Sequence, residues 1–196
     1  MYKKQVKLQK ILCLALLMVS AIIFIYSLGI MTDLYDALYS TIRSAKNLDK
    51  STVTGSRVYY DMQDFNKLFL RLSIVMVLMC VTLFVTNTHN RRKYYIGNYC
   101  SIALVSAGGI GFAVWAHGQI EAFKAQFLGI NFEELAAHAE KRKTLYTDST
   151  FWFDIHYLIF GLLVIGIFLL IANTIWKRKL MREEQALIAG GKETVA

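Results

Sequence analysis

Apolar residues gather into four blocks along the chain, and polar residues separate these blocks. The blocks cover residues 11–31, 68–86, 99–116 and 155–176. Each is about 20 residues long, the length that an α-helix needs to cross a hydrocarbon core of roughly 30 Å. A helix also pairs its backbone N–H and C=O groups within its own segment, as a bilayer requires. The pattern predicts an all-α integral membrane protein, with four transmembrane helices forming a single domain over residues 1–196.

The composition supports this prediction and excludes several other classes of protein. Hydrophobic residues make up 56% of the chain, charged residues only 18%, and proline is absent. Ordinary soluble domains carry roughly a quarter of charged residues. Three cysteines are too few for a disulfide scaffold, and the apolar content excludes a disordered chain.

The basic residues predict the orientation of the four helices. Residues 1–10, the turn 87–98 and the tail 177–196 together carry twelve basic and three acidic residues, whereas the rest of the chain carries ten basic and eleven acidic. Lysine and arginine accumulate on the cytoplasmic side of a membrane protein. Both termini are therefore predicted to be cytoplasmic, and residues 32–67 and 117–154 to lie outside.

The basic residues lie close to the ends of the spans, where they contact anionic lipid headgroups. The lipid bilayer is thus the predicted partner of this charge, and nucleic-acid binding is not expected. The outer segments contain neither cysteine nor an N-x-S/T acceptor for glycosylation. These absences favour a bacterial plasma membrane over a eukaryotic cell surface. The four predicted spans make the chain a multi-pass protein of that membrane.

The two outer segments, each of about 36 residues, are longer than a simple helix connection requires. Apolar residues recur in them at helical spacing, first over residues 34–42 and then over 120–130 and 132–139. We expect a small helical layer outside the membrane, to which the first helix contributes by continuing to about residue 45. The alternative is that these amphipathic stretches lie flat in the headgroup region.

Small residues within the spans predict where helices pack closely. In the third block Ala103, Ala107 and Gly111 recur every four residues, and Gly108 and Gly109 lie between the last two. Small side chains let helix backbones approach in a membrane, so this helix is the expected packing hub. The alternative is a helix broken at Gly108 and Gly109 around a ligand, as in transporters. Small and polar residues also recur every seven residues in the first helix (Cys13, Ser20, Ser27) and in the second (Ser73, Cys80, Asn87), which predicts contact seams.

Ionisable residues near the membrane are costly unless they are paired, which makes them functional candidates. Arg71 and Asp154 lie at matching depths near the outer ends of helices two and four, and we expect them to form an interhelical ion pair. Two alternatives remain. Arg71 can act as an interfacial anchor, or it can pair with Asp61 or Asp64 of the adjoining outer segment.

Imidazole and carboxylate groups on the outer side suggest a metal site, because together they form a ligand set for zinc and related ions. The candidate ligands are His117, His138, His156, Glu133, Glu134 and Asp154. No pair of them has the spacing of an H-E-x-x-H motif. The alternative is that the histidines are interfacial or simply hydrogen-bonded.

No catalytic or nucleotide-binding motif is present, and no cofactor is predicted. The function that fits best is a non-enzymatic membrane protein: a subunit, scaffold or sensor that contacts a ligand, a membrane partner or further copies of itself through its outer layer. A small oligomeric channel or transport protein is the alternative. A membrane-embedded enzyme with an outer histidine and acid site ranks third.

Overall fold

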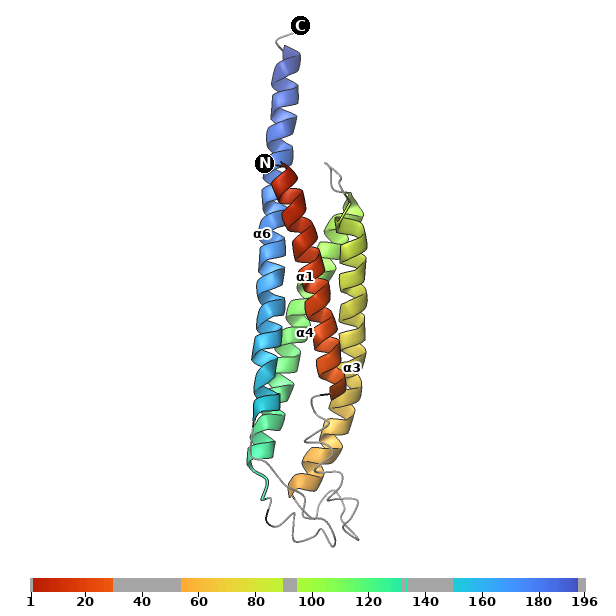
Figure 1. The fold of residues 1–196 in the computed structure, drawn as a ribbon, viewed down its shortest axis with the longest axis vertical. Coiled ribbons are helices and arrows are strands. Elements are labelled where there is room, and N and C mark those ends of the chain that lie inside the picture. Colours follow the sequence, from red (N-terminus) through yellow and green to blue (C-terminus); the bar gives the residue numbers. More distant parts are fainter. Residues whose placement is uncertain (1, 30–53, 90–94, 132, 134–149, 194–196) are drawn as a thin grey trace. The chain divides into compact units, whose positions relative to one another are not determined.

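The computed structural model describes residues 2–29, 54–89, 95–131, 133 and 150–193, and these residues are helical with short turns. Four long helices follow one another along the chain (Figure 1): α1 (Tyr2–Gly29), α3 (Thr54–Asn87), α4 (Ile96–Leu128) and α6 (Phe151–Glu193). No β-strand occurs in these ranges. The predicted all-helical class is therefore confirmed.

Each helix covers the described residues of one of the four apolar blocks and is long and apolar enough to cross a membrane. Large apolar side chains are exposed along them; Met18, Leu78, Val114 and Phe168 are each 58–68% exposed. Exposed apolar surface of this extent is unfavourable in water but suits contact with lipid. The chain has the features of a multi-pass membrane protein.

The helices extend beyond the predicted spans because the apolar positions that face their neighbours continue past the ends of those spans. α3 begins at Thr54, and its early residues Val58, Met62 and Phe65 are buried. α4 continues to Leu128, and Ile120, Phe123 and Phe127 are buried along it. One stripe expected in the outer layer is thus a continuation of α4. The stretches 34–42 and 134–139 lie outside the described residues.

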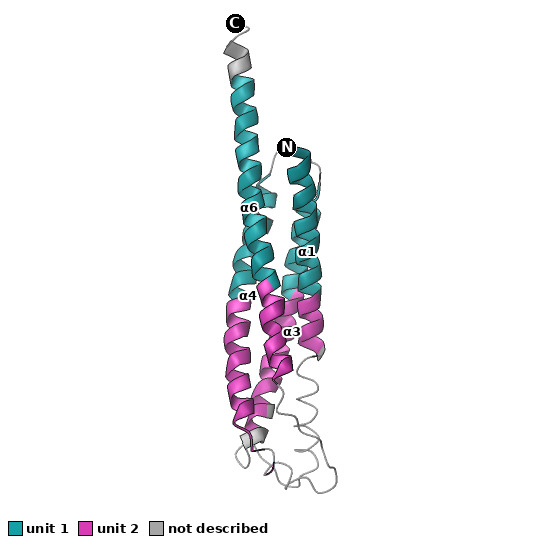
Figure 2. Ribbon diagram, turned by 60° about the vertical axis from the view of Figure 1, so that its left-hand side comes forward, with its two compact units in different colours: residues 1–21, 75–111, 162–196 teal, residues 22–74, 112–161 magenta. Residues whose placement is uncertain are grey.

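Two compact units divide the helices along their length (Figure 2). Unit 1 comprises residues 1–21, 75–111 and 162–196, and unit 2 comprises residues 22–74 and 112–161. Each unit therefore contains a part of all four helices. The two units are described separately below.

Unit 1 has an apolar core and several buried polar side chains. Leu16, Met76, Leu83, Val105 and Leu163 are at most 1% exposed. In the turn between α3 and α4, Asn98 accepts a hydrogen bond from the backbone N–H of Tyr95 (2.8 Å) and donates one to the carbonyl of Thr86 (2.6 Å). Tyr95 directly precedes α4, and Asn98 follows it by three residues. A side chain at this position can accept the hydrogen bond of an N–H group that the helix leaves unpaired. It thereby joins the start of α4 to the end of α3.

Aromatic rings fill the core of unit 2. The ring of Phe69, which is 1% exposed, has neighbours from the other three helices: Tyr26 at 6.0 Å, Phe112 at 5.6 Å and Phe160 at 6.3 Å between ring centroids. Phe65 stacks on Phe69 at 5.3 Å. Aromatic pairs at such distances stabilise a core beyond the area that they bury.

Burial confirms five of the six residues of the seams with a seven-residue spacing: Cys13, Ser20, Ser73 and Cys80 are 0% exposed and Asn87 is 4% exposed, whereas Ser27 is half-buried. In unit 2 the hydroxyl groups of Ser27 and Ser73 are 2.9 Å apart, which joins α1 to α3. Each hydroxyl also lies within hydrogen-bond distance of a carbonyl of its own helix, so one serine donates to its carbonyl and the other donates to that serine.

Candidate functional site

Two histidines and a glutamate meet in unit 2, contributed by two helices. His117 and Glu121 are four residues apart on α4 and so share one face of that helix. His156 lies on the first turns of α6. One ligand atom from each of the three residues lies within 4.8 Å of the other two. We call His117, Glu121 and His156 the His–Glu cluster.

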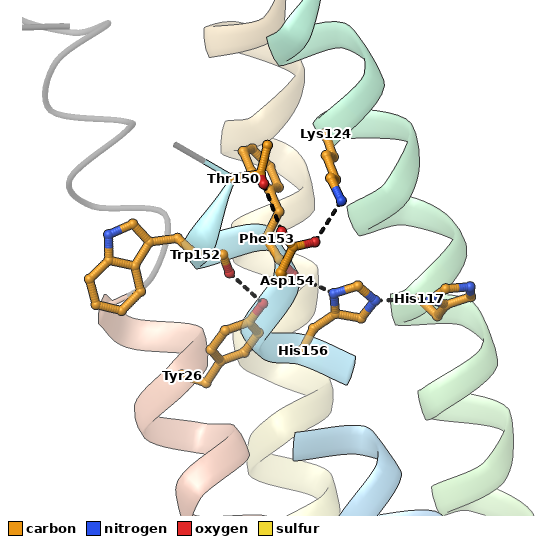
Figure 3. Close-up of polar contacts among 8 residues, drawn as sticks. All are labelled: Tyr26, His117, Lys124, Thr150, Trp152, Phe153, Asp154 and His156. Atoms are coloured by element: carbon orange, nitrogen blue, oxygen red, sulfur yellow. Dashed lines mark hydrogen bonds and ion pairs between the residues drawn. The ribbon is translucent and has the colours of Figure 1, made fainter. Parts of the chain in front are cut away.

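The imidazole of His156 is held between two partners (Figure 3). Its Nδ1 forms a hydrogen bond with the backbone carbonyl of Phe153, and its Nε2 lies 2.9 Å from Nδ1 of His117. A carbonyl can only accept, so Nδ1 of His156 carries the proton and Nε2 presents a lone pair toward His117. His156 is 1% exposed, whereas His117 is exposed. The cluster therefore reaches from the core of unit 2 to its surface.

The carboxylate of Glu121 contains a buried oxygen, Oε1, that has no hydrogen-bond partner. Such an oxygen is costly, because burial removes water and nothing replaces it. The phenol of Tyr157 is within hydrogen-bonding reach of the Glu121 carboxylate, and its ring lies 4.2 Å from the ring of His156 between centroids. Tyr157 thus covers one side of the cluster.

Asp154 is occupied by a different pair of contacts. Its Oδ1 lies 2.5 Å from Nζ of Lys124, and its Oδ2 accepts a hydrogen bond of 2.7 Å from the hydroxyl of Thr150 (Figure 3). Asp154 also lies in the first turn of α6, where a negative charge is favoured by the helix dipole. Lys124 belongs to α4, so this ion pair joins the same two helices as the His–Glu cluster.

The structure brings together only some of the predicted metal ligands. His117 and His156 meet, whereas Asp154 is paired with Lys124 and Glu133 is exposed. His138 and Glu134 lie outside the described residues. Glu121 stands in place of the expected carboxylates and was not among the predicted ligands. Its signal was the four-residue spacing from His117, which has meaning only if the helix continues beyond residue 116.

The ion pair expected between Arg71 and Asp154 is not among the ion pairs of the described residues. The partner of Asp154 is Lys124, and the side chain of Arg71 is exposed. Asp61 and Asp64 pair within α3, with Arg57 at 3.7 Å and Lys67 at 3.3 Å. The two residues do not lie at one height. The ring of Phe69 neighbours the ring of Phe160, and from this level Arg71 lies two residues further along α3, whereas Asp154 lies six residues earlier on α6.

Small residues of α4 divide into a packed pair and an exposed row. A Cβ atom added to Gly109 would lie 2.7 Å from Cδ1 of Ile167 and 3.1 Å from Cε of Met76, and one added to Gly108 would lie 2.9 Å from Cε of Met79. Ala103, Ala107 and Gly111 are exposed, and a Cβ at Gly111 would meet nothing within 4 Å. Close approach of the helices in unit 1 therefore occurs at Gly108 and Gly109 and not along the four-residue repeat. α4 is continuous through both glycines, so the helix is not broken there.

Buried amides form a second polar group, in unit 1. Asn173 of α6 donates a hydrogen bond to Oε1 of Gln9 of α1, and both side chains are at most 3% exposed. Gln5, one turn before Gln9, is 0% exposed, and neither its Nε2 nor its Oε1 has a partner. The sequence analysis did not single out these residues.

Comparisons with protein-family models, with curated proteins and with solved structures found no match to this chain. Function must therefore be argued from the site and from the packing around it.

Proposed function

We propose that this chain is a non-enzymatic, multi-pass protein of a bacterial plasma membrane that acts as a subunit, scaffold or sensor. Its partner would be another membrane protein, a further copy of the chain or a ligand outside the membrane. In this proposal both termini are cytoplasmic, and unit 2, which carries the segments predicted to lie outside, is the part that makes contact.

The observation that carries this proposal is the aromatic core of unit 2. Phe69 contacts rings from α1, α4 and α6, so side chains from all four helices meet at one level. Phe112 and Phe160 close the remaining side, with 5.5 Å between their centroids. Bulky apolar rings in contact leave no room for a file of water molecules at that level. This favours a packed scaffold over a single-chain channel.

A second candidate function is transport, and the buried amides of unit 1 favour it. Polar side chains buried in a membrane protein are costly and often mark the path of a substrate or an ion. Gln5 and Gln9 lie just before the first predicted span and Asn173 lies near the end of the fourth, so they would line the cytoplasmic end of such a path. Gln5 has no hydrogen-bond partner for either side-chain atom. The outcome of a flux measurement distinguishes the two candidates.

The test is purification in mild detergent, with the mass of the complex measured, followed by reconstitution into liposomes loaded with pH- and potassium-sensitive dyes. The scaffold proposal predicts a defined complex, of copies or with a co-purifying membrane protein, and ion flux equal to that of protein-free liposomes. Flux above that background that is abolished in Gln9→Leu, but kept in the exposed control Met18→Leu, would overturn it in favour of transport. A monomer without a co-purifying membrane protein would overturn the subunit and scaffold roles and leave the sensor of an outer ligand as the proposal.

A further inference from the structure

The geometry points to a binding site for a divalent transition-metal ion of the zinc type, formed by His117, Glu121 and His156. This inference concerns the site itself, and it holds whether the protein is a scaffold or a transporter. Three observations support it: the position of the donor atoms, the orientation of His156 and the unpartnered oxygen of Glu121.

The donor atoms of the three residues lie near the spacing that a tetrahedral ion requires. Zinc binds histidine nitrogen at about 2.0–2.1 Å and carboxylate oxygen at about 2.0–2.2 Å, so tetrahedral ligand atoms lie roughly 3.3 Å apart. In the His–Glu cluster the facing nitrogens are 2.9 Å apart, and one atom from each of the three residues lies within 4.8 Å of the others. An ion between them requires the imidazoles to separate by a few tenths of an ångström and the carboxylate to approach.

The backbone already orients His156 as a metal ligand. A histidine that binds a metal through one nitrogen usually donates the N–H of the other to a carbonyl or carboxylate, which fixes its tautomer and its direction. Nδ1 of His156 makes this bond to the carbonyl of Phe153, which leaves the lone pair of Nε2 pointing at His117. Without metal, Nδ1–H of His117 donates to this lone pair. On binding, His117 carries its proton on Nε2 instead, so both imidazoles stay neutral and no net proton is released from them.

The Oε1 atom of Glu121 is buried, and no described side chain donates a hydrogen bond to it. A positive partner would therefore stabilise this carboxylate. Lys124 is the nearby cation on the same helix, and its ammonium group is engaged by Asp154 at 2.5 Å. A bound cation would satisfy the buried oxygen and compensate its charge. His117 is exposed, so an ion can enter from the surface without opening the core.

The donor set selects the class of ion. Calcium and magnesium prefer sites built from oxygen ligands, whereas imidazole nitrogens suit zinc, copper, nickel and iron. Two histidines and one glutamate leave a fourth tetrahedral position open for water or an external ligand. In a sensor, this open position is where the protein-bound ion could meet its ligand.

The experiment uses the full chain, purified in detergent with an affinity tag that contains no histidine and freed of metal by a chelator. Zn²⁺ is titrated by calorimetry, and Co²⁺ serves as a spectroscopic probe of the ligand geometry. We expect one Zn²⁺ per chain and a visible spectrum of bound Co²⁺ typical of a tetrahedral site. His117→Ala and Glu121→Gln should each weaken binding at least tenfold, since each removes one ligand.

Two control variants keep the assignment specific. His89→Ala removes an exposed histidine of unit 1, and Asp154→Asn removes the neighbouring carboxylate that is paired with Lys124; both should bind Zn²⁺ as the wild type does. Absence of binding by the wild type overturns the inference, as does binding that His117→Ala and Glu121→Gln leave unchanged. Loss of binding in Asp154→Asn equal to that in Glu121→Gln overturns the assignment of the carboxylate. Both ligand variants should fold, because His117 is exposed and Glu121→Gln leaves the side-chain volume nearly unchanged. Elution volume and helical content verify that each variant is folded.

Discussion

Lys124 and Asp154 form an ion pair between α4 and α6, with 2.5 Å between Nζ and Oδ1. The exposed fractions of the two side chains are 22% and 42%, so water screens the pair only in part. Thr150 donates a hydrogen bond to the other carboxylate oxygen of Asp154 and holds it in place. The pair lies on the same two helices as the His–Glu cluster but shares no side chain with it.

The first prediction is that Lys124 and Asp154 are energetically coupled. Lys124→Gln and Asp154→Asn should each lower the Tm by about 2–4 °C, and the double variant should lose little more than either single variant, because the second change removes an interaction that is already lost. The measurement is a thermal melt of all four proteins in one detergent. Arg71→Gln is the control, and its effect should add to that of Asp154→Asn. Additive losses for Lys124 and Asp154 would contradict the prediction.

The second prediction concerns the packing of α4 in unit 1. Gly109→Leu should destabilise the protein by about 1–3 kcal/mol, because the added side chain must displace Ile167 and Met76 from a filled space. Gly111→Leu makes the same change two residues further along, where nothing lies within 4 Å of the added Cβ, and should stay within about 0.5 kcal/mol of the wild type. Denaturant or thermal unfolding in detergent compares the two. Equal losses would mean that the exposed row of small residues is packed in the assembled protein.

The apolar blocks were sufficient to predict the four helices, but they could not predict where each helix ends. Hydropathy falls at His117, Gly118 and Gln119, and this fall predicts that the third helix ends there. A few polar residues do not end a helix, however. α4 continues to Leu128 because Ile120, Phe123 and Phe127 still face the core of unit 2. The extension puts Glu121 and Lys124 on a helix, and both candidate contacts of the site depend on it.

Sequence spacing also located the small residues of α4 without showing which of them pack. Ala103, Ala107 and Gly111 share one face at a spacing of four, yet the buried positions in this part of the helix are Ile102, Val105, Gly109 and Phe112. These follow the 3.6-residue period with alternating steps of three and four. Ala103, Ala107 and Gly111 each lie one or two positions after a buried residue, so the whole row is on the exposed side of the helix.

The third prediction concerns the turn between α3 and α4. Asn98→Ala should cost about 1 kcal/mol, because it leaves the part-buried carbonyl of Thr86 and the N–H of Tyr95 without this side-chain partner. Cys100→Ala, two residues further along and exposed, is the matched control and should have little effect. Unfolding in detergent measures both. A loss for Asn98→Ala no larger than for the control would show that water replaces these bonds at no cost.

The last prediction concerns the orientation in the membrane, and it follows from the charge distribution alone. Residues 1–10, 87–98 and 177–196 carry twelve basic residues against three acidic ones, so they should remain in the cytoplasm. Single cysteines at positions 51 and 149, in a chain without the three native cysteines, should react with a membrane-impermeant maleimide added to intact cells. A cysteine at position 90 should react only after the cells are opened. Unit 2 contains both the His–Glu cluster and the segments predicted to be outside. The reverse labelling pattern would therefore place the cluster toward the cytoplasm, where a different pool of metal ions is available to it. The labelling experiment therefore also decides on which side of the membrane zinc should be supplied when the site is tested in cells.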